Sequence, residues 1–195
     1  MTTAFVIGNG RSRMNFNLEN LRKKGTIYGC NALYRDFKPD HLIAVDPKMI
    51  VEICQTGWQL TTPVWTNPNQ KYRDLQNLNF FRDPRGWSSG PSALLKACLD
   101  QHQTVFILGF DYQGVGNFFN NVYADTFNYK RSNEQPTYFG NWKKQTETLF
   151  KEYPNVNFFR VNGENPMVMK DWQVINNFRD ISYNEFGRMI ETPVS

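Results

Sequence analysis

Short apolar runs, separated by stretches with helix-like spacing, set the pattern of this chain. The six runs cover residues 4–8, 26–30, 41–45, 63–66, 105–109 and 156–161. Runs of this length that alternate with helical stretches are typical of buried parallel strands joined by crossover helices. The pattern predicts a Rossmann-like α/β fold with a doubly wound, mostly parallel sheet, and residues 1–195 are expected to form a single domain.

Four helical stretches are expected between the runs: at about residues 18–24, just after Pro47, at 91–102 and at about 137–153. Asn17 is the expected N-cap of the first stretch and Gly25 its stop, while Gly57 ends the second. The tail from residue 164 onward is expected to hold a loop, a short helix and an irregular ending.

Residues 112–136 form a long segment without regular periodicity that is rich in glycine, asparagine and aromatic residues. Loops of this length in compact domains are usually functional or disordered, and the aromatic content disfavours disorder. We expect a lid over a ligand site. The alternative is that the aromatic side chains only hold a long loop on the core.

Composition narrows the function classes. At 195 residues and 40% hydrophobic content the chain can bury one substantial core. No apolar stretch approaches the roughly 20 residues that span a bilayer. A soluble, unexported, cytoplasmic protein is expected. The net charge is +4, and the basic residues are scattered among carboxylates, so nucleic-acid binding is not indicated. A small anionic ligand would explain the surplus positive charge equally well.

Cysteine and histidine usage argues against a disulfide framework and a structural metal. Cys30, Cys54 and Cys98 are widely spaced and odd in number, so reduced thiols are expected. The two histidines, His41 and His102, offer no zinc-ligand spacing and no serine–histidine–acid triad. Both are expected to be ordinary surface or edge histidines.

The first apolar run leads directly into a glycine-rich turn, Gly8-Asn9-Gly10-Arg11-Ser12. Glycines let the backbone approach an anion, Ser12 adds a hydroxyl donor, and Arg11 or Arg13 can neutralise charge. The turn lacks the third glycine of a dinucleotide fingerprint and the GK[ST] of a P-loop. It predicts a phosphate site, with a tight turn that binds no ligand as the alternative.

Polar residues follow the other apolar runs as well, and in a parallel sheet such strand ends converge on one edge. The expected group is Gly8, Asn9, Gly10, Asn31, Asp46, Asn67, Gly109, Phe110 and Asp111, with the Ser88-Ser89-Gly90 turn at a helix N-terminus. These amides, hydroxyls and carboxylates suit a base, a ribose and a phosphate. Asp46 and Asp111 could each hold a ribose hydroxyl, bind a cation or act as a base, and Asp46 could instead cap the helix that follows it.

The motifs together resemble a known family. They are Val6-Ile7-Gly8-Asn9-Gly10-Arg11-Ser12, Tyr28-Gly29-Cys30-Asn31-Ala32-Leu33-Tyr34, Ala44-Val45-Asp46-Pro47, Ser88-Ser89-Gly90 and Ile107-Leu108-Gly109-Phe110-Asp111-Tyr112. In this order they resemble the small bacterial sialyltransferases, glycosyltransferases with a single Rossmann-like domain. The chain is also similar to proteins encoded by bacterial viruses and to archaeal pterin pyrophosphokinase-like proteins.

The resemblance implies roles for individual residues. Asn9, Gly10 and Asn31 would contact the phosphate and ribose of a cytidine-activated sugar, with Ser89 and Gly90 nearby. The resemblance also places Gly109, Phe110 and Asp111 around the cytidine.

The histidine that this family uses as a base has no counterpart in residues 117–162. The candidate bases are therefore Asp111, Asp125 and Glu134. Candidates for steadying the departing phosphate are Tyr123, Tyr129, Lys130 and Arg131, with loop anchoring as the alternative role of each tyrosine.

Three functions are consistent with these residues. The first is a glycosyltransferase that moves a sugar from a CMP-sugar donor to an unknown acceptor, with no required cofactor and Mg²⁺ as an optional aid. The second is a non-catalytic nucleotide-binding or sequestering protein, such as a viral accessory protein in the host cytoplasm. The third is a Mg²⁺-dependent phosphotransferase or pyrophosphotransferase, with Asp46 and Asp111 on the metal and Arg11 and Arg13 on the phosphates. The oligomeric state is left open.

Overall fold

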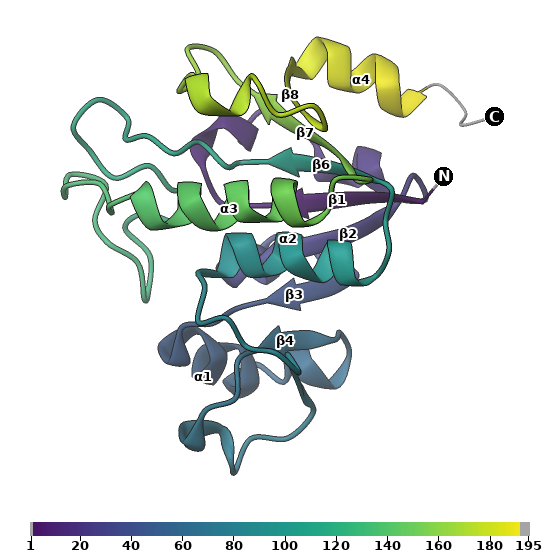
Figure 1. The fold of residues 1–195 in the computed structure, drawn as a ribbon. Helices are drawn as coiled ribbons and strands as arrows, with labels where there is room; N and C mark the ends of the chain where they lie inside the picture. The colour runs from purple at the N-terminus through teal and green to yellow at the C-terminus, as the bar shows by residue number, and fades with distance from the viewer. Residues whose placement is uncertain (1, 192–195) are drawn as a thin grey trace.

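An eight-stranded sheet organises residues 2–191, the part of the chain that the computed structural model describes (Figure 1). Every strand pairing is parallel, so the predicted doubly wound parallel sheet is confirmed. The strands are β1 (Thr3–Ile7), β2 (Thr26–Cys30), β3 (His41–Ile43), β4 (Val64–Thr66), β5 (Leu78–Phe80), β6 (Thr104–Leu108), β7 (Asn157–Asn162) and β8 (Phe178–Ser182).

The strand order is β5-β4-β3-β2-β1-β6-β7-β8, which places β1 in the middle of the sheet. From β1 the chain builds outward to β5, then crosses back to β6 and continues to β8. Ala4 therefore pairs with Thr26 on one side and with Val105 on the other. The order reverses between β1 and β6, and ligands of open parallel sheets bind beyond the carboxyl ends of the strands at such a point.

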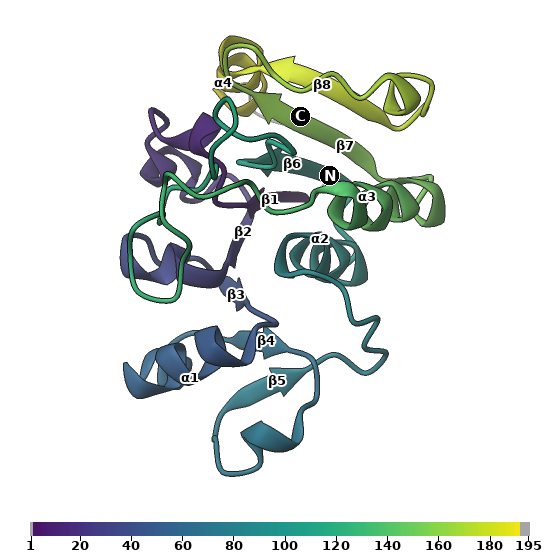
Figure 2. The same cartoon turned by 90° about the vertical axis from the view of Figure 1, so that its left-hand side faces the viewer.

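Helices cover both faces of the sheet: α1 (Pro47–Gln55), α2 (Ser89–Leu99), α3 (Gly140–Glu152) and α4 (Tyr183–Glu191). Figure 2 shows α2 and α3 on one side and α1 and α4 on the other. Successive strand residues point to opposite faces, so Ala4 and Val6 join the core under α2 and α3. Phe5 and Ile7 join the core on the face that α4 covers.

The predicted first helix is wrong, because residues 18–24 form only a 3-10 turn at Leu18–Leu21. The Asn17 side chain accepts the predicted capping hydrogen bond from the amide of Glu19, at 3.0 Å. Lys23 then takes a left-handed conformation with φ 65°, which ends helical geometry two residues before Gly25. The other predicted helices exist with shifted bounds.

In the tail the predicted short helix is present as α4, but the strand β8 was not predicted. The predicted irregular ending falls after α4, outside the described residues. In β8 only Phe178 and Ile181 are buried, and they point to opposite faces of the sheet. Such a strand has no alternation of apolar and polar residues for a pattern to detect. The three-residue edge strand β5 was missed for a similar reason, because none of its residues is buried.

Candidate functional site

A cavity of about 130 Å³ lies at the point where the strand order reverses. Its walls come from the ends of β1 and β6, the starts of α2 and α3, and the segment of residues 112–136, which is called the lid after its predicted role. In Figure 1 the teal-to-green lid lies beyond the carboxyl ends of β1 and β6. Of the thirteen residues predicted at this site, Ser12, Asp46 and Asn67 do not line the central cavity. The ten that do are Gly8, Asn9, Gly10, Asn31, Ser88, Ser89, Gly90, Gly109, Phe110 and Asp111.

The glycine-rich turn after β1 uses most of its backbone donors inside the protein. The amides of Gly8 and Gly10 donate to the carbonyls of Leu108 and Gly109, at 2.8 and 2.9 Å. Those of Arg11 and Ser12 donate to side-chain oxygens of Asn120 and Asp111. The predicted phosphate cup at positions 8–10 is therefore corrected, because the amides of Gly8 and Gly10 already donate to protein carbonyls.

A carboxylate from the end of β6 occupies the place where an anion was expected. Asp111 accepts hydrogen bonds from the Ser12 hydroxyl at 2.5 Å, the Ser12 amide at 3.1 Å and the Asn120 carboxamide at 3.0 Å. A Cβ atom on Gly10 would lie 2.5 Å from the Asp111 carboxyl carbon. Gly10 is thus required by the approach of Asp111, and Ser12 lies outside the central cavity.

Arg13 and Asn9 also have structural partners. Arg13 is buried, and its guanidinium donates to the Gly8 carbonyl at 2.7 Å and to the Asn9 side-chain oxygen at 3.2 Å. The Asn9 carboxamide in turn donates to the Cys30 carbonyl at 2.9 Å. The proposed role of Arg13 as a phosphate ligand is wrong, since its charge is held beneath the turn.

The start of α2 presents donors that the helix leaves unpaired. No side chain caps this end, and the first N–H groups of an α-helix have no intrahelical partner. Ser89 and Gly90 line the central cavity, at the positive end of the helix dipole. The Ser89 hydroxyl donates to the Asn31 side-chain oxygen at 2.8 Å and accepts from the Val45 amide at 3.1 Å. The anion-binding geometry thus belongs to this helix start.

Asn31 stands in a strained conformation at the end of β2. Its φ of 52° lies in the left-handed region, which asparagine tolerates better than most residues. Strain of this kind gathers at ligand sites. Because the Asn31 side-chain oxygen accepts from Ser89, its NH₂ group carries the donors that remain for a ligand in the cavity.

Aromatic side chains form the other wall of the central cavity: Phe110, Tyr112, Phe119, Phe139 and Trp142. Phe139 and Trp142 pair edge to face with ring centroids 5.6 Å apart. Sequence reasoning missed both as site residues. Their spacing of three positions at the start of a helix puts both rings on one helix face, a signal that could have identified them.

Two further cavities adjoin the central one. The second, of about 790 Å³, shares Asp111, Gln113 and Asn120 with it. The third, of about 250 Å³, shares Asn31, Ser88, Ser89 and Trp142. Asp46 lines the third cavity and also caps α1, because its carboxylate accepts from the Lys48 amide at 2.8 Å.

The predicted catalytic residues divide between the cavities and the lid. Asp111 lines the central and second cavities, and Tyr129 lines the third, where its hydroxyl accepts from the Ala32 amide at 3.4 Å. Tyr123 is buried, and its hydroxyl accepts from Arg13 at 3.4 Å. Asp125 is exposed, and hydrogen bonds from the Ser132 hydroxyl and amide lower the pKa of its carboxyl. Neither Tyr123 nor Asp125 lines any of these three cavities.

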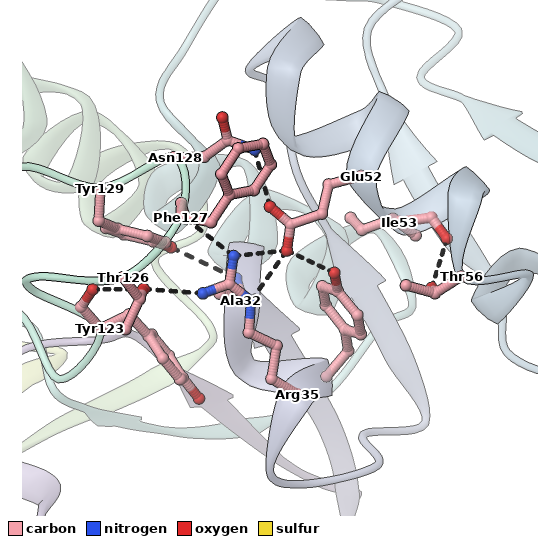
Figure 3. Close-up of polar contacts among 11 residues, drawn as sticks. Ala32, Arg35, Glu52, Ile53, Thr56, Tyr123, Thr126, Phe127, Asn128 and Tyr129 are labelled. Carbon is pink, nitrogen blue, oxygen red and sulfur yellow. Dashed lines mark hydrogen bonds and ion pairs between the residues drawn. The ribbon is translucent and has the colours of Figure 1, made fainter.

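A polar clasp holds the far part of the lid on the core (Figure 3). Glu52 of α1 accepts from the Tyr34 hydroxyl at 2.6 Å, from Arg35 at 2.5 and 2.8 Å, and from the Asn128 carboxamide at 2.7 Å. Arg35 also donates to the Thr126 hydroxyl and the carbonyl of residue 127. Burial alone would raise the pKa of Glu52, but the hydrogen bonds from Tyr34, Arg35 and Asn128 outweigh it and lower that pKa.

The two histidines belong to a polar cluster at the amino end of the sheet, away from the cavities. The His102 ring is buried and lies 2.9 Å from the Tyr28 hydroxyl, and the His41 ring stacks on Tyr28. The expectation of ordinary surface or edge positions is therefore wrong for His102. In residues 2–191 no group of three His, Cys, Asp or Glu side chains has an arrangement that could hold a metal.

The cysteines are free thiols in the structure. Burial raises the pKa of both Cys30 and Cys98 to about 12, so neither is a reactive thiolate. Cys54 is half-buried.

Comparisons with known proteins add no relative: no family model, no curated protein and no solved structure matches the chain. The resemblance to the small bacterial sialyltransferases therefore stays a prediction. Across residues 2–191, no helix has both the length and the apolar character needed to cross a membrane.

Proposed function

We propose that this chain is a glycosyltransferase-like protein that binds a CMP-sugar in the central cavity and passes the sugar to an acceptor. The observation that carries the proposal is the unpaired start of α2, where Ser89 and Gly90 border a cavity at the strand-order reversal. Helix starts at this place in an open parallel sheet favour the phosphate of a nucleotide.

The charge of the cavity favours a ligand with a single phosphate. Of the described residues that line it, none is a lysine or an arginine, and Asp111 contributes a negative charge. Sites for nucleoside diphosphates and triphosphates usually add cationic side chains or a bound metal. A CMP-sugar carries one phosphodiester charge, which the α2 dipole and amides can balance.

The cavity walls suit the remaining parts of such a ligand. The aromatic wall with Phe110 and Trp142 offers faces on which a pyrimidine can stack, and Asn31 offers donors to a ribose or phosphate oxygen. At about 130 Å³ the central cavity is smaller than the few hundred Å³ that whole ligands need. The donor would therefore extend into a neighbouring cavity.

The proposed reaction transfers the sugar between two oxygens. The bond from the anomeric carbon to the phosphate oxygen breaks, and its electron pair leaves with CMP. The acceptor hydroxyl oxygen bonds to the same carbon, and Asp111 takes the hydroxyl proton. Tyr129 lines a cavity with Ser88 and Ser89, so its hydroxyl proton can stabilise the departing phosphate.

A specific observation favours the non-catalytic alternative. Asp111 already accepts three hydrogen bonds from Ser12 and Asn120, which suits a structural carboxylate as well as a base. A protein that only binds or sequesters a nucleotide would keep the α2 site and use Asp111 to position the turn.

The arrangement gives less support to the Mg²⁺-dependent phosphotransferase. Asp46 and Asp111 line different cavities, and Asp46 caps α1. Arg13, one of the two cations expected to hold phosphates, is buried under the turn.

Calorimetric titration with CMP, CDP and CTP tests the binding site. We expect CMP to bind at least as tightly as CTP, with or without Mg²⁺. Asn31→Gly should weaken CMP binding about tenfold, because glycine keeps the left-handed backbone and removes only the carboxamide.

The matched control is Asn77→Gly, since Asn77 is also left-handed with φ 60° and lines none of the three cavities. It should leave CMP affinity unchanged. Failure of all three nucleotides to bind would overturn the proposal, and Mg²⁺-dependent preference for CTP would favour phosphotransfer.

Turnover separates the transferase from the binding protein. Release of CMP from CMP-sialic acid is measured with a panel of acceptors, and Asp111→Asn should slow it at least about 100-fold while CMP still binds. Tight CMP binding without turnover for any acceptor or for water would leave the sequestering function as the explanation.

A further inference from the structure

We infer that the second cavity is a binding site for a neutral, polyhydroxylated ligand, that is, a saccharide. The acceptor role given to that saccharide rests on the proposed function, but its binding does not. The cavity volume of about 790 Å³ lies within the range for small-molecule sites. The turn after β1, the start of the lid and the loop between β7 and β8 form its walls.

The charges around this cavity are few and mixed. Arg11 contributes a positive charge, and Asp111 and Glu164 contribute negative ones. Asp111 is already held by Ser12 and Asn120. A second phosphate or another anion would find no excess of positive charge here, so a neutral ligand fits the electrostatics better.

Carboxamides supply much of the polar lining: Asn15, Gln113, Asn120, Asn162 and Asn165. A carboxamide both donates and accepts hydrogen bonds, as a sugar hydroxyl does. The Asn162 carboxamide donates to Asp180, and that of Asn120 donates to Asp111. Asn15 and Asn165 are both exposed, and within residues 2–191 the one hydrogen bond of Asn165 is made by its backbone carbonyl, which accepts from Gln113. These two side chains can therefore pair with ligand hydroxyls.

An aromatic pair forms the apolar part of the wall. Phe16 and Tyr183 lie with ring centroids 5.4 Å apart, at a tilt of 31°. Ring faces of this kind cover the C–H face of a sugar, which is the apolar side of an otherwise polar molecule. Aromatic faces beside carboxamides thus match both sides of a saccharide.

The Tyr183 hydroxyl points to the same ligand chemistry. Its oxygen is buried and makes no hydrogen bond of normal distance and angle within residues 2–191. The neighbouring Ser12 hydroxyl, whose hydrogen goes to Asp111, is within reach of the Tyr183 hydroxyl as an acceptor. A buried hydroxyl whose contact lacks normal hydrogen-bond geometry is poorly satisfied, and a ligand hydroxyl in this cavity would give it a better partner.

Asp111 and Asn120 join the saccharide site to the nucleotide site. Both residues line the second and the central cavity. A hydroxyl bound in the second cavity can thus face the Asp111 carboxylate while a phosphate lies at the start of α2. Under the proposed function, the saccharide in the second cavity is the acceptor.

Saturation-transfer difference NMR with lactose, maltose and N-acetylglucosamine tests the inference, each with and without CMP. We expect at least one of them to receive saturation from the protein. Tyr183→Phe should weaken binding of that sugar about tenfold, since it deletes only the hydroxyl. Asn165→Gly should weaken it as well, because φ is 50° there and glycine keeps the backbone.

Matched controls carry the same chemical changes elsewhere. Tyr138→Phe deletes a hydroxyl on an exposed side chain, and Asn77→Gly deletes a left-handed carboxamide, both outside the three cavities. Both should leave sugar binding unchanged.

Two results would overturn the inference: no saturation of any sugar in either condition, or equal sugar binding by Tyr183→Phe, Asn165→Gly and the wild type. CMP binding in the same samples separates the two claims. CMP binding without sugar binding rejects only the second-cavity site, and sugar binding without CMP binding rejects only the nucleotide site.

Discussion

Two turns meet at the central cavity, one after β1 and one before α2, and they use their backbone donors in opposite ways. In the turn after β1 the amides of Gly8, Gly10 and Ser12 all donate to protein acceptors. At the start of α2 the amides of Ser89 and Gly90 have no partner within the helix. The glycine-rich turn has the sequence signature of a phosphate site, but the helix start has its geometry.

The difference arises from what faces each turn. The turn after β1 lies beside the end of β6, and Gly109 and Asp111 reach its amides directly. The start of α2 faces the cavity and has no capping side chain. A glycine-rich turn can therefore serve close packing between neighbouring strand ends.

The largest effect expected is that of Gly10→Ala. The new methyl group would lie within 2.7 Å of the Asp111 carboxyl atoms, and overpacking of this kind should destabilise the protein by about 3 kcal/mol. Urea unfolding measures it. A matched control is Gly187→Ala in α4, where a Cβ meets no atom within 4 Å, and it should stabilise the protein by about 1 kcal/mol. Equal stability of Gly10→Ala and the wild type would remove the packing explanation for this glycine.

Disruption of the clasp around Glu52 should have the next largest effect on stability. Glu52→Gln leaves the half-buried Arg35 without its counter-charge and should destabilise the protein by about 2 kcal/mol. Faster hydrogen exchange is expected at residues 126–128, because they lose their tie to α1. Glu19→Gln, in the exposed pair with Arg22, is the control and should change stability by less than about 0.5 kcal/mol.

Glu52→Gln also tests whether the region around the third cavity and the turn after β1 loosen independently. The clasp lies beside the third cavity and far along the lid from Asn120, so CMP dissociation should accelerate while the turn after β1 keeps its hydrogen-exchange protection. Equal loosening of both regions would show that they form one cooperative unit.

Ser12→Ala should have a smaller effect on stability and none on the nucleotide. It removes one hydrogen bond to Asp111 and should destabilise the protein by about 1.5 kcal/mol. Because Ser12 does not line the central cavity, CMP affinity should equal that of the wild type in calorimetry. A tenfold loss of affinity would restore the turn after β1 as the anion site.

The smallest effect expected is a pH dependence that originates at the opposite end of the sheet. Burial lowers the pKa of His41 and His102, and the Lys96 charge adds to this while Asp100 opposes it. The folded state therefore favours the neutral form of both rings. Their contribution is complete above the unfolded pKa of about 6.5 and is lost as the pH falls from there through the lowered folded pKa.

Thermal unfolding between pH 8 and pH 5 checks the sign. The melting temperature should fall below pH 6.5, and less steeply in a His41→Phe, His102→Gln double variant, which keeps the stacking and an acceptor. An equally steep fall in the double variant would assign the pH dependence to other groups.

Sequence patterns were sufficient for most of the sheet. Six predicted strands correspond to β1, β2, β3, β4, β6 and β7, because each is an apolar run. The two outer strands, β5 and β8, were not predicted, because strands at the edges of the sheet bury few side chains and need no apolar run. Their pairing depends on neighbours distant in sequence, which local patterns do not report.

The position of the site could be predicted from the sequence, but the hydrogen-bond partners of its residues could not. The rule that strand ends converge correctly placed Asn31 and Asp111 around one cavity, and the expected helix N-terminus added Ser89. It could not reveal that the Asp111 carboxylate takes the Ser12 donors, a contact across 99 positions. Asp125, which the sequence offered as readily as Asp111, is exposed on the lid.

The central place of β1 shapes how the chain must be assembled during synthesis. One edge of β1 pairs early with β2, but its other edge waits for β6, about a hundred residues later, as the pairing of Ala4 with Val105 shows. Until the ribosome has released β6, the growing chain exposes an unpaired, apolar strand edge that other chains can join. Folding of the nascent protein therefore depends on keeping that edge shielded until β6 is available to pair with it.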